Sequence, residues 1–164
     1  TANPSQRRAM LAAKVEDMIN TVVRQIAFYA FERKVHLARA QGELTAEQIN
    51  GLWMSVQAES LGPAISLDAG YEPFWAYIPH FIHSPFYVYA YAFGDCLVNS
   101  LYGVYAKAEE GFVDRYFALL SSGGAKPYGE LLAPFGLNAR DPGFWQIGLS
   151  MIEGMIAELE AMEA

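Results

Sequence analysis

Residues 77–95 read YIPHFIHSPFYVYAYAFGD, and the rest of the chain is organised around them. The second half of this stretch has the features of a helix start, because Ser84 suits a helix cap and Pro85 suits the first helical position. We therefore predict a loop that carries His80 and His83 and runs directly into a long helix.

Three tyrosines, Tyr87, Tyr89 and Tyr91, lie at the start of this predicted helix. A single aromatic ring at helical spacing is more often a core residue than a functional one. Tyr87 and Tyr91 are four residues apart and share a helix face, whereas Tyr89 lies well round the helix from both. Three hydroxyls beside two imidazoles are a stronger signal than any one of them, because such donors hold a peptide carbonyl or stabilise an oxyanion. Both interpretations, core aromatics and a catalytic cluster, stay open here.

The composition excludes several classes of protein. A chain of 164 residues is long enough for one domain with a sizeable core, and 53% hydrophobic against 18% charged residues predicts burial on more than one side. A formal charge of −7 argues against a nucleic-acid-binding surface. Asp95 and Asn99 interrupt the longest apolar run, so we predict no membrane span. The single cysteine, Cys96, excludes an internal disulfide and fits a reducing compartment, so we expect a cytoplasmic protein.

The helix signals along the chain predict an all-α fold. A capping box at residues 45–48 marks the start of the second helix. Residues 85–109 are apolar nearly all round, which predicts one buried central helix. No repeat or linker divides the chain, so we predict a single multi-helix bundle over residues 1–164. The expected helices span residues 7–39, 45–61, 85–109, 112–121, 127–134 and 142–161, the last of them capped by Asp141, with a loop over 64–75.

A metal site built from this chain alone is the weaker interpretation of His80 and His83. Two histidines in an HxxH pattern need at least one more protein ligand, and no HExxH motif occurs in the sequence. A site formed by His80, His83 and a carboxylate stays an alternative, which a zinc titration would test.

The other polar residues in apolar surroundings have structural explanations. Glu32 and His36 are four residues apart on the opening helix, and the charges around them favour a solvated or structural pair. Asp95 needs a partner or a cavity inside its apolar helix, and Cys96 beside it is expected to be an inert buried thiol.

The stretch WAYIPHF at residues 75–81, followed by SPFYVYAYAFG at 84–94, closely resembles the oligoendopeptidase F family of zinc metallopeptidases. That family belongs with the thimet-oligopeptidase-like enzymes. The resemblance covers nearly the whole chain. It also includes RQIAFYAFE at 24–32 with His36, GELT at 42–45, NGL at 50–52, LLSSGG at 119–124 and DPGFW at 141–145.

This resemblance implies the carboxy-terminal part of a peptidase catalytic domain. In the family, an HExxH motif and a later glutamate bind zinc, and all of them lie upstream of the part that this chain matches. The resemblance therefore implies zinc in the parent enzyme, none in this chain, and no activity of this part alone. It further implies that His80 and His83 contact substrate and that Tyr87, Tyr89 or Tyr91 stabilises the tetrahedral oxyanion.

The resemblance also implies partners for this chain: an oligopeptide substrate and the missing amino-terminal half of the enzyme. Ala90 stands where many members of the family carry a polar residue such as glutamine. We expect an exposed apolar face that binds the missing half or forms a homodimer. The alternative is a non-catalytic helical module, derived from the family, that binds peptides or a protein. The reading frame upstream of Thr1 separates these, since HExxH there supports the enzyme and a start codon there supports the module.

Overall fold

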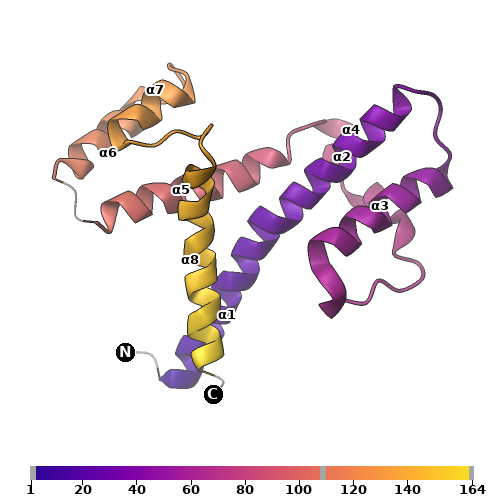
Figure 1. The fold of residues 1–164 in the computed structure, drawn as a ribbon, viewed down its shortest axis with the longest axis horizontal. Helices are drawn as coiled ribbons and strands as arrows, with labels where there is room; N and C mark the ends of the chain where they lie inside the picture. The colour runs from indigo at the N-terminus through magenta and orange to yellow at the C-terminus, as the bar shows by residue number, and fades with distance from the viewer. Residues whose placement is uncertain (1–2, 108–109, 163–164) are drawn as a thin grey trace. The chain divides into compact units, whose positions relative to one another are not determined.

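The part of the chain that the structure describes, residues 3–107 and 110–162 of a computed structural model, contains helices, turns and loops but no β-strand (Figure 1). This confirms the all-α prediction. The α-helices are α1 Pro4–Ile19, α2 Gln25–Arg39, α3 Ala46–Leu61, α4 His80–His83, α5 Tyr89–Tyr105, α6 Phe112–Ser122, α7 Tyr128–Leu132 and α8 Pro142–Ala161. A π-helical turn spans Asn20–Arg24, and 3₁₀ turns span Gly62–Ala64, Glu72–Tyr77 and Ala133–Phe135.

Local capping signals account for several helix boundaries. Thr45 Oγ1 accepts a hydrogen bond from the backbone N–H of Gln48 at 3.3 Å, and the Thr45 N–H donates to Gln48 Oε1 at 2.8 Å. This confirms the predicted capping box at the start of α3. In the same way Asp141 Oδ1 accepts from the Gly143 N–H at 2.8 Å, and α8 begins at Pro142 as predicted.

The described residues form two compact units, each with its own core. One unit combines residues within Thr1–Glu16 and Gly94–Ala164, and the other comprises Asp17–Phe93. Because residues 17–93 lie between the two segments of the first unit in the sequence, we call the first the outer unit and the second the central unit. The prediction of a single domain over residues 1–164 stays a prediction.

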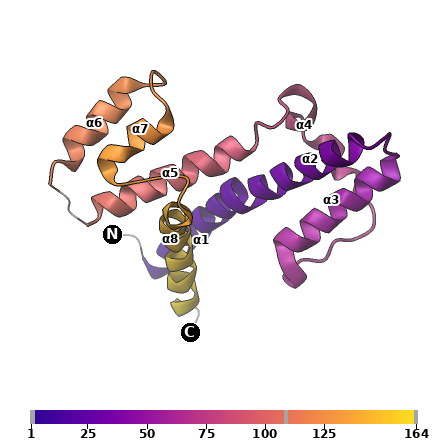
Figure 2. The same ribbon diagram turned by 45° about the horizontal axis from the view of Figure 1, so that its top comes forward.

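The core of the central unit is aromatic and lies where α2 packs along α3 (Figure 2). Trp53 of α3 is 1% exposed, and its ring centroid lies 5.2 Å from that of Phe31 and 5.6 Å from that of Phe28. Phe81 of α4 packs against Phe31 at 5.1 Å, and Val88 is fully buried in the same core. This core therefore supports the segment between α4 and α5.

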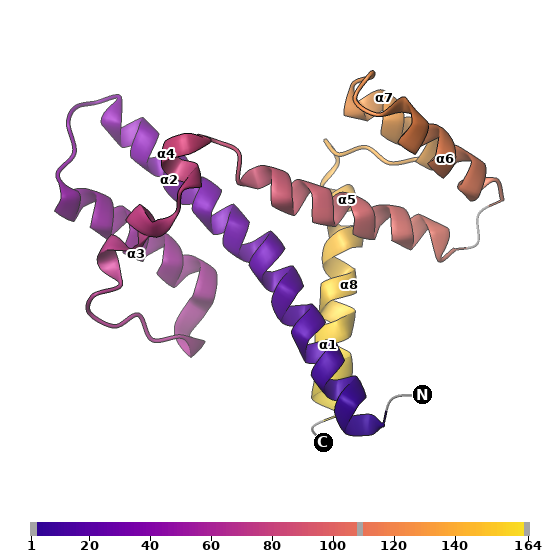
Figure 3. The same ribbon diagram turned by 180° about the vertical axis from the view of Figure 1, so that it is seen from behind.

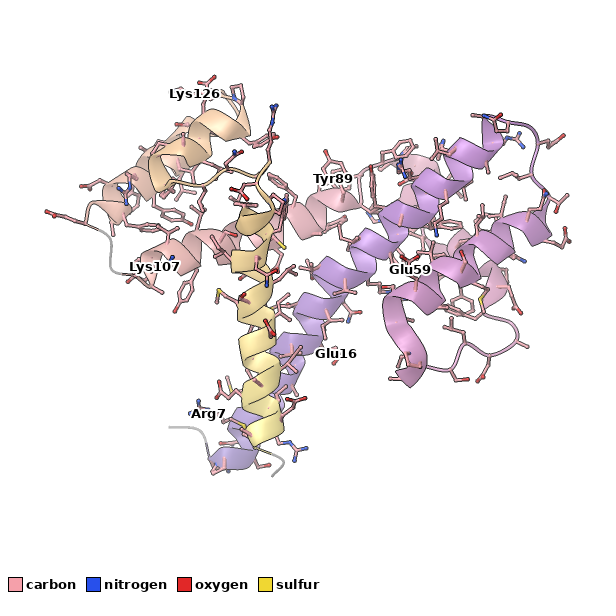
Figure 4. The ribbon with its side chains drawn as sticks, in the orientation of Figure 1. Arg7, Glu16, Glu59, Tyr89, Lys107 and Lys126 are labelled. Atoms are coloured by element: carbon pink, nitrogen blue, oxygen red, sulfur yellow. The ribbon has the colours of Figure 1, made fainter. Side chains whose placement is uncertain are left out.

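The core of the outer unit joins the second half of α5 to α6, α7 and α8, and α6 and α7 lie side by side (Figure 3). Ser100 Oγ of α5 donates a hydrogen bond to the carbonyl oxygen of Phe144 in α8 at 2.9 Å. Arg7 of α1, labelled in Figure 4, forms an ion pair with Glu158 of α8. The buried residues of this core are Leu101, Val104, Phe112, Leu132, Phe135, Leu137 and Phe144.

The central helix differs from its predicted form in two respects. Helix α5 begins at Tyr89 instead of residue 85, because Phe86 has a left-handed backbone with φ of 60° that no α-helix accommodates. Its predicted end at residue 109 lies outside the described residues. The prediction of a buried helix is confirmed on one face only, since Cys96 is 3% and Ser100 is 0% exposed, whereas Val98 is 63% and Tyr102 is 54% exposed.

Cys96 and Asp95 of α5 have the structural surroundings that the sequence suggested. Cys96 is buried, and its burial, followed by the nearby charge of Asp95, raises the pKa of the thiol. The thiol is therefore neutral at pH 7. Asp95 Oδ2 accepts a hydrogen bond from Asn99 Nδ2 at 2.9 Å, which supplies the partner that the carboxylate needs. Within the described residues, none of the helices is long and apolar enough to cross a membrane.

Two glycines of α8 are expected to respond in opposite ways to alanine. A Cβ added at Gly148 would lie 3.1 Å from the carbonyl oxygen of Cys96, a backbone atom that cannot easily move. We expect Gly148→Ala to lower the free energy of unfolding by about 1–3 kcal/mol. A Cβ at Gly154 meets no atom within 4 Å, so Gly154→Ala should raise it by about 0.5–1 kcal/mol. Urea unfolding followed by circular dichroism measures both, and equal effects at the two sites would contradict this packing.

Candidate functional site

Three aromatic side chains from the central sequence motif form one cluster at the surface of the central unit. His80 Nε2 lies 2.9 Å from the Tyr91 hydroxyl, within hydrogen-bonding distance. The rings of His80 and Tyr87 are stacked, with centroids 6.1 Å apart and planes inclined by 6°. Tyr91 meets Tyr87 edge to face at 5.4 Å. We call His80, Tyr87 and Tyr91 the His/Tyr cluster.

Short elements on either side of a bend bring the cluster together. His80 begins α4, which ends where the Ser84 N–H donates to the His80 carbonyl oxygen at 3.0 Å. The predicted helix start at Ser84 and Pro85 is therefore wrong, because these residues lie in the bend between α4 and α5. Tyr87 lies in the bend, and Tyr91 lies in the first turn of α5.

The other two predicted site residues lie outside the cluster. Tyr89 is the first residue of α5 (Figure 4), and its ring packs against Tyr29 of α2 with centroids 6.1 Å apart. His83 ends α4 and is exposed. The structure therefore brings together three of the five residues that the sequence singled out, and the role of each stays a prediction.

The cluster is accessible to a ligand. Tyr87 is 51% exposed and Tyr91 is 38% exposed, so neither ring is an ordinary core aromatic. The Tyr91 hydroxyl lies within hydrogen-bonding distance of His80 Nε2, whereas the Tyr87 hydroxyl forms no hydrogen bond with any of the described residues. When His80 carries its proton on Nε2, it donates to Tyr91 and leaves the Tyr91 O–H as a donor as well. The cluster then presents two phenolic donors to the same region.

A cluster of metal ligands is absent from the described residues, among which no three His, Cys, Asp or Glu side chains group together. His80 is engaged with Tyr91, and His83 lies at the exposed end of α4. Three protein ligands are the usual minimum for a zinc site, so the residues present do not fit zinc.

Glu32 is a buried residue beside the site whose importance the sequence analysis missed. It is 2% exposed, and its Oε1 accepts a hydrogen bond from the Phe86 N–H at 2.7 Å. Its Oε2 has no hydrogen-bond partner among the described residues, so the predicted pair with His36, solvated or structural, is wrong. The sequence does contain a signal for this burial, because Glu32 follows Phe28 by four residues and so lies on the apolar face of α2.

The fold and the site define the class of this protein when they are compared with known proteins. The sequence pattern of peptidase family M3 matches residues 1–151, so the chain belongs to that family. The oligoendopeptidase-F from Enterococcus faecium, a solved structure, superposes with a TM-score of 0.90 at 26% identity, covering 99% of this chain and 31% of that one. A putative peptidase from Chlamydophila abortus gives a TM-score of 0.88 at 28% identity, covering 99% of this chain and 27% of its own.

Within family M3, the relatives of this chain include several oligoendopeptidases F, which confirms the resemblance read from the sequence. The plasmid-borne oligoendopeptidase F of Lactococcus lactis subsp. cremoris is 28% identical over 158 residues, which cover 96% of this chain and 26% of the relative. Oligopeptidase PepF of Bacillus subtilis is 28% identical over 158 residues, covering 96% of this chain and 23% of the relative. The chain spans about a quarter of the length of these curated relatives.

Proposed function

We propose that this chain supplies the substrate-binding and oxyanion-stabilising wall of a zinc-dependent oligoendopeptidase that hydrolyses internal bonds of short peptides. The observation that carries the proposal is the His/Tyr cluster, in which an imidazole and two phenols meet at an accessible surface. Membership of peptidase family M3 supplies the reaction class. We place the rest of the catalytic apparatus in a longer polypeptide that includes this chain.

The His/Tyr cluster suits the charge that develops during peptide hydrolysis. Attack of water on a peptide carbonyl turns its oxygen into an oxyanion, and a positioned O–H donor stabilises that oxygen more than it stabilises the neutral carbonyl. We assign this donation to Tyr87, whose hydroxyl is not engaged by the described residues, with Tyr91 as a second donor held by His80. His80 and His83 would contact the peptide, and Tyr89 remains a third candidate donor.

In this proposal, residues outside this chain bind the zinc ion. When bound there, the ion would polarise the scissile carbonyl and activate water. The described residues do not provide a ligand set for it, so each role that we assign to this chain concerns hydrogen bonding and substrate position. We also propose a cytoplasmic location, because the one cysteine is a free thiol.

An apolar groove in the outer unit supports contact with the rest of the peptidase polypeptide. The groove has a volume of about 310 Å³ and is lined by side chains of α5 and α6. Exposed apolar patches of this kind are typical of interaction sites. The exposed residues that line the groove are Val98, Tyr102, Tyr105, Val113, Tyr116 and Phe117. A homodimer through the same face would be the alternative use of this surface.

The proposal is tested by comparing this chain with a longer polypeptide that contains it together with an upstream HExxH motif. We expect the longer protein to bind zinc and to cleave a short internally quenched peptide, with activity lost on chelation and restored by zinc. We expect the 164-residue chain to show neither stoichiometric zinc binding in a calorimetric titration nor cleavage. Peptide binding by the chain, together with a start codon directly upstream of it, would instead support the non-catalytic binding module.

A further inference from the structure

The bend that carries Tyr87 contains the one non-glycine residue with positive φ among the described residues. Phe86 has φ of 60°, in the left-handed region that a bulky side chain rarely occupies. Such a conformation persists only where the surroundings hold it in place. The contacts of Phe86 therefore indicate what fixes the bend.

Helix α2 holds Phe86 by both its backbone and its ring. Glu32 Oε1 accepts a hydrogen bond from the Phe86 N–H at 2.7 Å, in a site where Glu32 is only 2% exposed. Four residues after Glu32 on α2, the His36 ring packs against the Phe86 ring, with centroids 4.6 Å apart. Glu32 and His36 share a helix face, so the two contacts act together as a clamp on one residue.

This clamp sets the position of Tyr87, because it acts on the preceding residue in the chain. The Tyr87 side chain is half exposed, and its ring meets the rings of His80 and Tyr91. On its other side Val88 is fully buried in the core of the central unit. Tyr87 thus lies between a clamped residue and a buried one, which hold its backbone in place.

We propose that Glu32 is a positioning residue for the oxyanion site, acting through the Phe86 N–H to hold Tyr87 against His80 and Tyr91. This proposal rests on the function proposed above. A buried carboxylate is costly unless hydrogen bonds compensate it. The Phe86 N–H supplies one such hydrogen bond, to Oε1, in the residue whose backbone has the unusual positive φ, and Oε2 has no partner among the described residues.

The first test reads the position of Tyr87 directly and does not depend on activity. In the 164-residue chain, the nuclear Overhauser effect between the ring protons of Tyr87 and Tyr91 should be lost in Glu32→Leu. It should persist in Glu32→Gln, which keeps an acceptor oxygen, and in Glu59→Leu, which removes an exposed carboxylate elsewhere in the central unit. A folded Glu32→Leu that retains the effect overturns the proposal.

Phe86→Gly provides a second variant should Glu32→Leu fail to fold. Glycine adopts a φ of 60° without strain, so the chain can still make the bend. It lacks the ring that packs on His36, and the bend loses part of its clamp. We expect a weakened effect between Tyr87 and Tyr91 in this variant, and an unchanged effect overturns the clamp.

The second test uses kinetics of the longer polypeptide. We expect Glu32→Leu to lower kcat by about 10–100-fold, as a misplaced catalytic group does, and Glu32→Gln to restore most of it. In the Tyr87→Phe background, Glu32→Leu should lower kcat no further, because both changes act on the same hydroxyl. An equal loss in both backgrounds overturns the positioning role. A normal kcat in the Tyr87→Phe variant itself overturns the catalytic assignment of Tyr87. In that case the nuclear Overhauser effect between the rings of Tyr87 and Tyr91 still decides whether Glu32 holds the bend.

Discussion

Tyr87→Phe in the longer peptidase polypeptide is expected to lower kcat by about 10²–10³-fold, the usual effect of removing one oxyanion donor. The substitution removes a hydroxyl that no described residue engages and keeps the ring that stacks on His80. Because the hydroxyl would interact mainly with the developing oxyanion, KM should change little. Steady-state hydrolysis of a short internally quenched peptide measures both constants.

The corresponding changes at the neighbouring tyrosines show which hydroxyl is the donor. Tyr91→Phe should lower kcat as well, because it removes the hydroxyl that lies 2.9 Å from His80 Nε2. Tyr89→Phe should have the smallest effect, since that ring packs against Tyr29 and lies outside the cluster. A pattern in which Tyr89→Phe alone abolishes turnover would reassign the donor to Tyr89. Full activity in all three variants would remove the catalytic assignment of the tyrosines.

The sequence predicted the starts of α3 and α8 well, and in both a short polar side chain caps the helix. Thr45 and Asp141 each satisfy a free backbone N–H a few residues downstream, and their helices begin where those signals placed them. Such caps depend on neighbouring residues in the chain, so a single sequence is enough to find them. The end of α3 at Leu61 follows equally from Gly62, whose φ is 66°.

The sequence failed where a contact between distant residues overrides the local signal. Taken alone, Ser84 and Pro85 have the features of a helix start. In the structure the chain bends there instead, and the Phe86 N–H donates a hydrogen bond to Glu32, which lies 54 residues earlier in the chain. The exposure of one face of α5 was equally hidden, because an apolar side chain looks the same in a sequence whether it faces a core or a partner. Tyr87 and Tyr91, which were predicted to share a helix face, are in contact, although Tyr87 precedes the helix.

The core of the central unit links stability to the site. Phe81 directly follows His80 and packs on Phe31, and Val88 directly follows Tyr87 and is fully buried. Both neighbours of the cluster in sequence are therefore part of the aromatic core around Trp53. A change in that core should move the cluster, even though no core residue contacts substrate in the proposed mechanism.

Trp53→Ala is accordingly expected to have the largest effect on stability, lowering the free energy of unfolding by about 3–5 kcal/mol. Trp53 is 1% exposed and its ring contacts Phe28, Phe31 and Tyr71, so alanine would leave a large cavity. Urea unfolding of the 164-residue chain followed by circular dichroism measures the loss.

Two tryptophan-to-phenylalanine substitutions separate ring packing from hydrogen bonding in this core. Trp53 Nε1 has no hydrogen-bond partner among the described residues, so Trp53→Phe keeps an aromatic ring and removes a buried unpaired donor. Trp75 Nε1 donates to Asn50 Oδ1 at 2.7 Å, so Trp75→Phe should lose about 1 kcal/mol from that bond. We expect Trp53→Phe to cost far less than Trp53→Ala. If Trp53→Ala itself costs under about 1 kcal/mol, against the 3–5 kcal/mol typical of buried aromatic truncations, the central unit is not built around this ring.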